Sequence, residues 1–402
     1  MKYKNLLAYA CLTGMLVAHA ASFAQSKITP ESINAAAGNI EQKVIAWRHD
    51  FHEHPELGNR EFRTADIIAK HLQALGLEVQ TKVGVTGVVA ILKGGKPGAV
   101  VALRADMDAL PVEEKTNLPY ASKVKTTYAG KETSVMHACG HDAHVAILMG
   151  VAEILSGMKK DLSGTVKFIF QPAEEGVPPG EQGGAELMVK EGVLENPKVD
   201  AIFGLHMNAQ TETGKISYRP GGILAAVGTL KITVKGKPSH GASPWFSVDP
   251  IVVSAQIINN LQTIVSRNVN VTENPVVVTI GSIHGGNRDN IISEQVEMLG
   301  TVRTFSAEDE KLVYARIREV VEHTALSAGA TAEVLLPYHH YYPVTFNDEN
   351  LTAAMLPSLQ KAAGKENVVL QKPKQARKIS HSFSRRFRGC ISLLVDCPKA
   401  RM

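Results

Sequence analysis

The chain has 402 residues, of which 44% are apolar and 20% charged, so it is long enough for two globular domains with full cores. This composition excludes a disordered or collagen-like protein. The formal charge of +4 is unevenly distributed along the chain. The first 24 residues contribute +2 and the segment after residue 370 contributes +8, which leaves −6 for residues 25–370. Basic ends alone are poor grounds for nucleic-acid binding, and we expect no nucleic-acid partner.

The first 24 residues have the layout of a secretory signal peptide. A basic start (Lys2, Lys4) is followed by an apolar stretch at 6–17 and by alternating small residues up to Ala24. A membrane span would need about 20 apolar residues, and neither this stretch nor a later one supplies them. We expect cleavage after Ala24, with Ala20 as the alternative position, and a secreted protein, periplasmic in a cell with two membranes. Only three cysteines then remain, too few for a disulfide scaffold.

Helix and strand patterns alternate through the first half of the chain. Apolar residues recur at helical spacing in 32–47, 62–75 and 143–155, and short β-branched or apolar runs occupy 88–92, 100–103, 166–170 and 201–205. We predict an α/β fold with a mostly parallel sheet, covered by helices on both faces.

Polar residues follow three of these strands directly. Asp106 and Asp108 come after the second run, Glu174 and Glu175 after the third, and His206 after the fourth. Open α/β sheets place their functional sites outside the carboxyl ends of their strands, so we expect these side chains to lie together.

The pattern changes near residue 214. Strands at 229–234, 276–282, 295–304 and 332–335 and helices at 250–265 and 308–328 predict a small antiparallel sheet with two helices on one face. We therefore divide the chain into a signal peptide (1–24), a catalytic domain in two parts (25–213 and 337–402) and an inserted ferredoxin-like lid or dimerisation domain (214–336).

The segment M-H-A-C-G-H-D-A-H, residues 136–144, concentrates groups that bind metals. Imidazole and thiolate are good donors for Zn²⁺ and neighbouring ions, and nearby carboxylates add oxygen donors. Cys139 and His141 can face one ion from an irregular turn, which Gly140 makes easy to form. The segment predicts a metal centre.

Six motifs occur in the order known from the metal-dependent amidohydrolases. They are H-P-E-L-G from His54, R-A-D-M-D-A-L-P from Arg104, the metal segment, Q-P-A-E-E-G from Gln171, G-L-H from Gly204 and K-P-S-H-G-A-S-P from Lys237. From about residue 40 to 370 the chain resembles this family, which includes aminoacylases, hippurate hydrolase and indoleacetyl-amino-acid hydrolases and is related to carboxypeptidase G and acetylornithine deacetylase.

The resemblance implies a binuclear site for two divalent ions, zinc, manganese or cobalt, with metal-activated water as the nucleophile. The implied metal ligands are Cys139, His141, Glu175 and His206. Glu174 is the implied general base, and we expect Asp108 to orient a ligand histidine. The expected substrates are N-acyl or N-aroyl amino acids such as hippurate, or small dipeptides.

The inserted domain carries further candidates. The resemblance implies that His240 assists at the oxyanion and that Asn290 contacts substrate, while Arg303 is a candidate partner for the substrate carboxylate. A plain turn, a turn cap and a strand-surface arginine are the respective structural alternatives. The resemblance also allows a homodimer through this domain. We expect His137 and His144 to pack or cap rather than to ligate, and His49, His52 and His54 to have a structural role at a helix end.

The ending departs from the family. A G-x-E-D-F-S segment, an aromatic strand and a late metal-binding histidine are not recognisable after residue 371, where basic residues and two cysteines accumulate. We interpret this as a reading-frame shift, which would remove one ligand and a late strand, and the alternative is that His381 replaces the lost ligand. A catalytically impaired, metal-binding or small-molecule-binding homologue is therefore the alternative to an active hydrolase.

Overall fold

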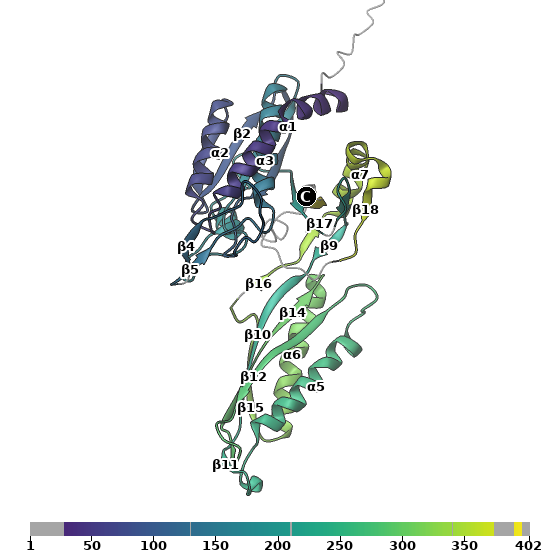
Figure 1. The fold of residues 1–402 in the computed structure, drawn as a ribbon. Coiled ribbons are helices and arrows are strands. Elements are labelled where there is room, and N and C mark those ends of the chain that lie inside the picture. Colours follow the sequence, from purple (N-terminus) through teal and green to yellow (C-terminus); the bar gives the residue numbers. More distant parts are fainter. Residues whose placement is uncertain (1–27, 129, 210, 340, 374–389, 396–402) are drawn as a thin grey trace, which may run out of the picture.

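The computed structural model describes residues 28–373, apart from 129, 210 and 340, together with 390–395. The predicted signal peptide, His381 and most of the anomalous ending lie outside the described residues. The chain forms two α/β units, each built on its own sheet (Figure 1). No helix in the described part of the chain combines the length and hydropathy needed to cross a bilayer.

The first unit is built on a mixed sheet. Its strands lie in the order β1 (Glu78–Val83), β2 (Gly87–Lys93), β6 (Ser163–Gln171), β3 (Lys96–Asp106), β7 (Ala201–Met207), β19 (Cys390–Val395), β8 (Ile216–Tyr218) and β18 (Val368–Leu370). The pairs from β6 to β19 are parallel, whereas β1, β2 and β6 pair antiparallel. The predicted α/β fold is confirmed; the sheet, expected to be mostly parallel, is mixed, with parallel pairs at its centre.

Helices cover both faces of this sheet. One core joins α1 (Pro30–Glu53), α2 (Phe62–Ala74) and α3 (His141–Gly157) to Phe168 and Phe170 of β6, and a second core joins α4 (Gly184–Lys190) to the intervening Ile169. Successive side chains of a strand point to opposite faces, so an unbroken apolar run is what a strand buried on both faces requires.

One expectation about the ending is wrong. We expected the loss of a late strand, but residues Cys390–Val395 form β19 inside the sheet, parallel to β7 and antiparallel to β8. The physical reason is that the sequence C-I-S-L-L-V is almost entirely apolar and favours an interior strand, even if a frame shift produced it.

The second unit is an antiparallel sheet with two helices on one face. Its order is β12 (Val277–Gly285), β14 (Gln295–Thr304), β10 (Ala226–Lys235) and β15 (Thr331–Leu335), and β16 (Tyr341–Tyr342) also pairs with β10. One apolar core joins α5 (Pro250–Asn268) and α6 (Ala307–Ser327) to this sheet. The predicted architecture is confirmed, and the domain boundaries at 214 and 336 stay predictions.

The remaining elements connect or flank the two sheets. They are the hairpin β4 (Lys125–Tyr128) and β5 (Lys131–Ser134), the pair β9 (Gly221–Leu224) and β17 (Thr345–Asn347), the pair β11 (Ser239–His240) and β13 (Ile291–Ile292), helix α7 (Glu349–Ala363) and the short turns η1 (Pro244–Phe246) and η2 (Lys365–Asn367).

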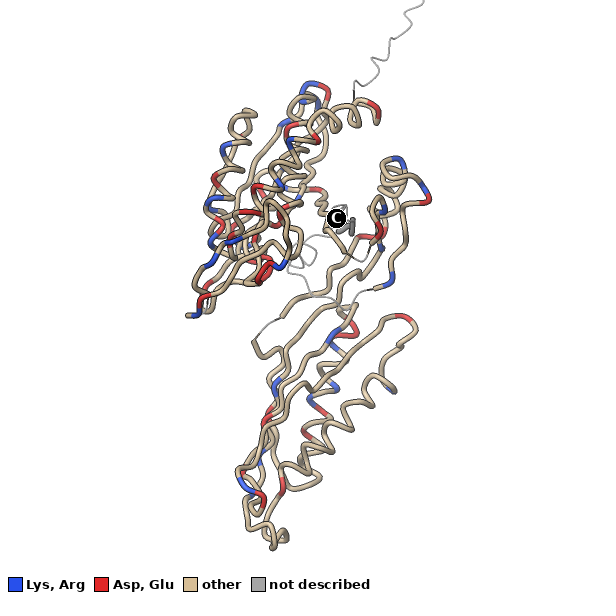
Figure 2. The backbone as a smooth tube through the Cα atoms, viewed as in Figure 1, with Lys and Arg blue, Asp and Glu red and all other residues tan. Residues whose placement is uncertain are grey.

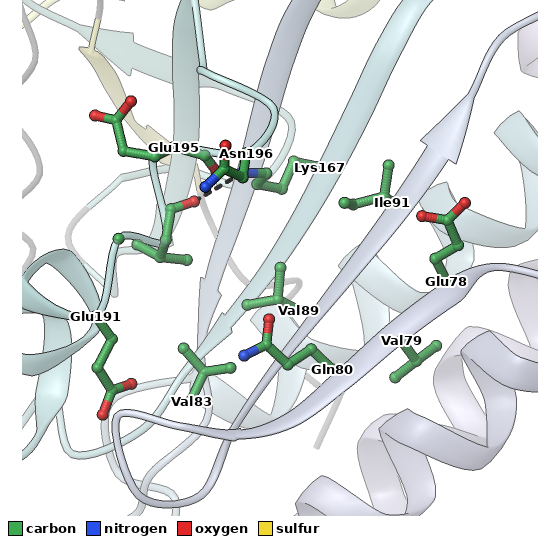
Figure 3. A pocket seen from close by; sticks show the side chains of 12 residues that line it. Glu78, Val79, Gln80, Val83, Val89, Ile91, Lys167, Glu191, Glu195 and Asn196 are labelled. Atoms are coloured by element: carbon green, nitrogen blue, oxygen red, sulfur yellow. Dashed lines mark hydrogen bonds between the residues drawn. The ribbon is translucent and has the colours of Figure 1, made fainter.

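A buried lysine of the first sheet is hydrogen-bonded to residues 193–197, which lie in the connection before β7. The ammonium of Lys167 donates to the carbonyl oxygens of Val193, Glu195 and Pro197 at 2.6–2.9 Å. The side chain borders a cavity of about 330 Å³ between β1, β2 and this connection (Figure 3). The three carbonyls satisfy the buried charge.

Candidate metal centre

Three neighbouring parallel strands end at the same edge of the first sheet. β3 lies between β6 and β7, so the residues after β6, the residues after β3 and the end of β7 meet there. Helix α3 starts at this edge, after Gly140 with φ +86°. A Cβ on Gly140 would lie 2.8 Å from the Cβ of Met207, so both the conformation and the close approach require glycine.

The four predicted metal ligands lie together. Possible ligand atoms of Cys139, His141 and Glu175 all lie within 4.8 Å of one another, and His206 belongs to an overlapping cluster with His141. The Sγ of Cys139 is 3.6 Å from Nε2 of His206. Two donors bound tetrahedrally to one ion by bonds of about 2.0–2.3 Å are separated by roughly 3.5 Å, so this spacing suits a shared cation.

His141 provides the test of whether a metal fits. Its Nε2 is fully buried and has no hydrogen-bond partner among the described residues. The same atom lies 3.7 Å from Oε2 of Glu174 and 3.8 Å from Oε1 of Glu175. These separations are too long for hydrogen bonds. An imidazole nitrogen and carboxylate oxygens are ligands that divalent metals accept, and the gap between them leaves room for an ion. The residues present therefore fit the implied ions.

Asp108 fixes the orientation of two predicted ligands. The Nδ1 of His141 donates to the carbonyl oxygen of Asp108 at 2.8 Å and lies 3.2 Å from its carboxylate. The other carboxylate oxygen accepts the backbone N–H of Glu175 at 2.7 Å. Because Nδ1 is the donor, the lone pair of His141 is at Nε2, on the side of the cluster. This geometry agrees with the orienting role predicted for Asp108.

The cluster also contains Asp106, which was expected at this edge of the sheet without an assigned role, and His144, which was expected to pack or cap. Nδ1 of His144 contacts Asp106, and its Nε2 accepts the backbone N–H of Met207 at 2.8 Å. His144 thus joins the end of β3 to the end of β7, next to His206. The opposite oxygen of Asp106 pairs with Nη1 of Arg104 at 2.8 Å. The alternation R-A-D-M-D was the available signal, since both aspartates follow one strand and point to the same side.

The electrostatics of the site favour positive charge. Burial alone raises the pKa of Asp106, but Arg104, His141 and His144 outweigh it and hold that pKa well below its usual range. Burial lowers the pKa of His141, yet Asp106 and Asp108 raise it well above its ordinary value. A proton on His141 and a bound cation are alternative ways of supplying this charge, because ligation requires the neutral imidazole.

The candidates in the inserted domain lie apart from this cluster. His240 on β11 and Asn290 are neighbours, since the N–H of Gly241 donates to the carbonyl oxygen of Asn290 at 2.8 Å. Both are exposed at the end of the second sheet away from the first unit, so one chain does not bring them to its own metal cluster (Figure 1). Arg303 sits opposite Val227 at the other end of that sheet. Their proposed roles stay predictions.

The histidines near the end of α1 have the structural contacts expected of them. His52 is buried, with Nδ1 3.0 Å from Asp142 and Nε2 3.3 Å from Glu114. His49 stacks on Tyr120, and the Nδ1 of the more exposed His54 bonds to a carbonyl of the preceding turn. His137 is buried too, and none of these four side chains belongs to a described metal cluster.

The chain is similar to known metal-dependent hydrolases and peptidases, as the donor cluster would lead one to expect. Residues 102–388 match the peptidase family M20/M25/M40. The chain is 41% identical to thermostable carboxypeptidase 1 of Saccharolobus solfataricus over 80% of this chain and 78% of that protein. It is 42% identical to the N-acetylcysteine deacetylase of Bacillus subtilis, over 76% of each protein.

A solved structure shares both the fold and the family. It is that of the Bacillus subtilis YXEP protein, described as a dinuclear metal-binding peptidase of family M20, with a TM-score of 0.75 and 34% identity over 89% of each chain. Identity of this size over most of the chain, together with the donor cluster, shows the class of chemistry. The chain therefore belongs to the peptidase family M20/M25/M40 and is a metal-dependent hydrolase of carbon–nitrogen bonds.

Proposed function

We propose that this chain hydrolyses the amide bond of N-acyl or N-aroyl amino acids, or of small dipeptides, with Glu174 as the general base. The observation that carries the proposal is the position of two adjacent glutamates around one imidazole. Oε2 of Glu174 and Oε1 of Glu175 lie 3.7 and 3.8 Å from Nε2 of His141. Glu174 is buried whereas Glu175 is partly exposed, so the two acids have different surroundings.

We assign the two glutamates different roles: Glu175 binds metal and Glu174 transfers the proton. Divalent ions, when bound by Cys139, His141, Glu175 and His206, would supply Lewis-acid activation that lowers the pKa of water toward about 7. Glu174 then accepts the proton of the attacking water at its carboxylate. It delivers this proton to the nitrogen of the leaving amine as the C–N bond breaks, which yields a carboxylic acid and an amino acid.

The test is hydrolysis of hippurate, N-acetyl amino acids and dipeptides by the full chain, with zinc, manganese or cobalt added in turn. We expect amino-acid release that the Glu174→Gln variant loses by about 10²–10⁴-fold, while the variant keeps the metal content of the parent. Unchanged turnover in this variant would remove the proposed base.

A metal-binding homologue without turnover is the second candidate. It is favoured by the ending of the sequence, in which the late histidine of the family is not recognisable. Bound metal without release of product from any of the three substrate classes would favour this candidate. Turnover restored by adding an ion to the metal-free protein would favour the hydrolase.

We also propose a homodimer through the second domain. Helix α5 carries a single charged residue, Arg267 (Figure 2). Its exposed face includes Ile251 and Val252. Strand β12, at the edge of the same sheet, has no charged side chain. Depletion of charge is typical of the centre of an interface. Light scattering should give twice the chain mass, and Val252→Glu should reduce it to the mass of one chain.

Export is a further proposal, supported by the signal-like pattern of residues 1–24. Expression of the full chain in a bacterium with two membranes should give a periplasmic product whose first residue is Gln25. An unprocessed cytoplasmic product would contradict export.

A further inference from the structure

The loop that carries Glu174 is hydrogen-bonded to a buried carboxyl group, that of Glu61, which lies more than one hundred residues earlier in the sequence. One oxygen of Glu61 accepts the backbone N–H of Ala173 at 2.7 Å. The other oxygen is hydrogen-bonded to the hydroxyl of Thr86, at 2.5 Å. Glu61 has no exposed surface, so water does not compete for these bonds.

The segment so held has an unusual backbone. Ala173 has φ +48°, in the left-handed region that a residue with a Cβ rarely adopts. On the other side of Glu174, the N–H of Glu175 donates to Asp108 at 2.7 Å. Two buried carboxylates therefore hold the peptide groups on either side of Glu174, and a strained backbone persists only where such contacts over-determine it.

The position of Glu61 at the start of α2 suggests a helix cap, but its side chain makes no capping hydrogen bond. Glu56 does this instead, because its carboxylate accepts the N–H groups of Arg63 and Thr64 at 3.0 and 2.8 Å. The carboxylate of Glu61 is thus directed to the catalytic loop and not to its own helix.

We propose that Glu61 is a positioning residue for the general base: by holding the N–H of Ala173, it fixes the backbone from which Glu174 reaches the reacting water. The inference rests on the role proposed for Glu174. A displacement of about 1 Å at a reacting group can cost on the order of 10²-fold in rate, so loss of this hydrogen bond should affect turnover more than substrate binding.

The electrostatics agree with this placement. Burial, followed by the charge of Asp108, raises the pKa of Glu61 to about 8. Near neutral pH Glu61 is therefore mostly neutral, which lowers the cost of burying it beside Asp108, and a neutral carboxyl group can still accept the N–H of Ala173 through its carbonyl oxygen.

The experiment compares Glu61→Met, which removes the acceptor at similar volume, with Glu61→Gln, whose amide oxygen can still accept from Ala173. We expect Glu61→Met to lower kcat by about 100-fold, with KM and metal content within about threefold of the parent. Glu61→Gln should keep most of kcat near neutral pH. The matched control is Glu56→Met, which removes a helix cap, and it should lower stability and leave kcat unchanged.

A second measurement does not depend on activity. Hydrogen–deuterium exchange of the metal-free protein should show faster exchange in the 172–176 peptide of Glu61→Met, and unchanged exchange there in Glu61→Gln and Glu56→Met. Unchanged exchange in Glu61→Met would overturn the inference. If Glu61→Met does not fold, a large loss of kcat in Glu61→Gln with normal exchange would also overturn it.

The two proposals fail in different ways. An active Glu174→Gln variant would contradict the proposed base whatever Glu61 does. An inactive Glu174→Gln variant beside a fully active Glu61→Met variant would contradict only the positioning role.

Discussion

The carboxylate of Asp108 accepts the backbone N–H of Glu175 at 2.7 Å, and its other oxygen lies 3.2 Å from Nδ1 of His141. One buried side chain thereby orients two predicted ligands that are 34 positions apart in the sequence. Loss of a residue that orients metal ligands in this way typically lowers metal affinity by about 10–100-fold.

Asp108→Asn should therefore weaken metal binding by about 10–100-fold, because an amide cannot accept both hydrogen bonds. Competition with a chromophoric chelator measures this. The control is Asp200→Asn, since Asp200 also accepts a backbone N–H, that of Val100 at 2.8 Å, but does so at the opposite end of the strands. Equal metal affinity in all three proteins would argue against the orienting role.

Gly58, the last residue of H-P-E-L-G, lies against the loop of Glu174. A Cβ added there would be 2.4 Å from the carbonyl oxygen of Gly176. Gly58→Ala should therefore lower the free energy of unfolding by about 1–3 kcal/mol, because overpacking forces the backbone to move. In Gly38→Ala the new Cβ meets nothing within 4 Å, in the middle of α1, so this control should be neutral or up to about 1 kcal/mol more stable. Urea unfolding distinguishes these outcomes.

His52 should make stability depend on pH. Burial lowers its pKa, but hydrogen bonds and charge from Asp142 and Glu114 outweigh this and raise the pKa above 6.5. The folded state thus binds the proton more tightly than the unfolded state. The resulting stabilisation is fully present below about pH 6.5 and is lost as pH rises through the folded pKa. Unfolding of His52→Gln and the parent should differ more at pH 6 than at pH 9, and a constant difference would contradict this assignment.

Lys167→Met should destabilise the fold without altering the metal centre. The substitution leaves three carbonyl oxygens without the ammonium that they accept from, and unsatisfied buried groups cost about 1–3 kcal/mol each. Lys93→Met is the control, because Lys93 is exposed and pairs with Glu78 at the surface. Calorimetry should show a lower Tm for the first variant alone, with equal metal content in both.

Much of this fold was predictable, because its central strands are continuous apolar runs and its helices have clear periodicity. Strands such as β8 and β18 were missed, since three residues carry no pattern. The exposed edge strand β1 was missed as well, because only one of its residues is buried. The late strand β19 was not anticipated because residues 390–395 carry none of the family's late motifs, although the run C-I-S-L-L-V has high strand propensity.

The candidate site was predictable where residues are close in sequence or follow strand ends. Glu175 and His206 meet because β6 and β7 end at the same edge of the sheet, on either side of β3. Cys139 and His141 join them because helix α3 starts at that edge. The role of Glu61 was not predictable, since its partner Ala173 is 112 residues away and contributes only a backbone N–H. His240 and Asn290 show the converse limit, because a motif gives a residue's identity but not its distance from the metal.

The central claim is that four side chains gather divalent metal at this edge of the sheet. Elemental analysis of the purified protein, after equilibration with zinc, manganese or cobalt, tests it directly when the parent is compared with Cys139→Ser and His206→Asn and with His240→Asn as the control. The account predicts bound metal in the parent and in His240→Asn and a marked loss in the other two variants. Equal metal content in all four proteins would contradict it.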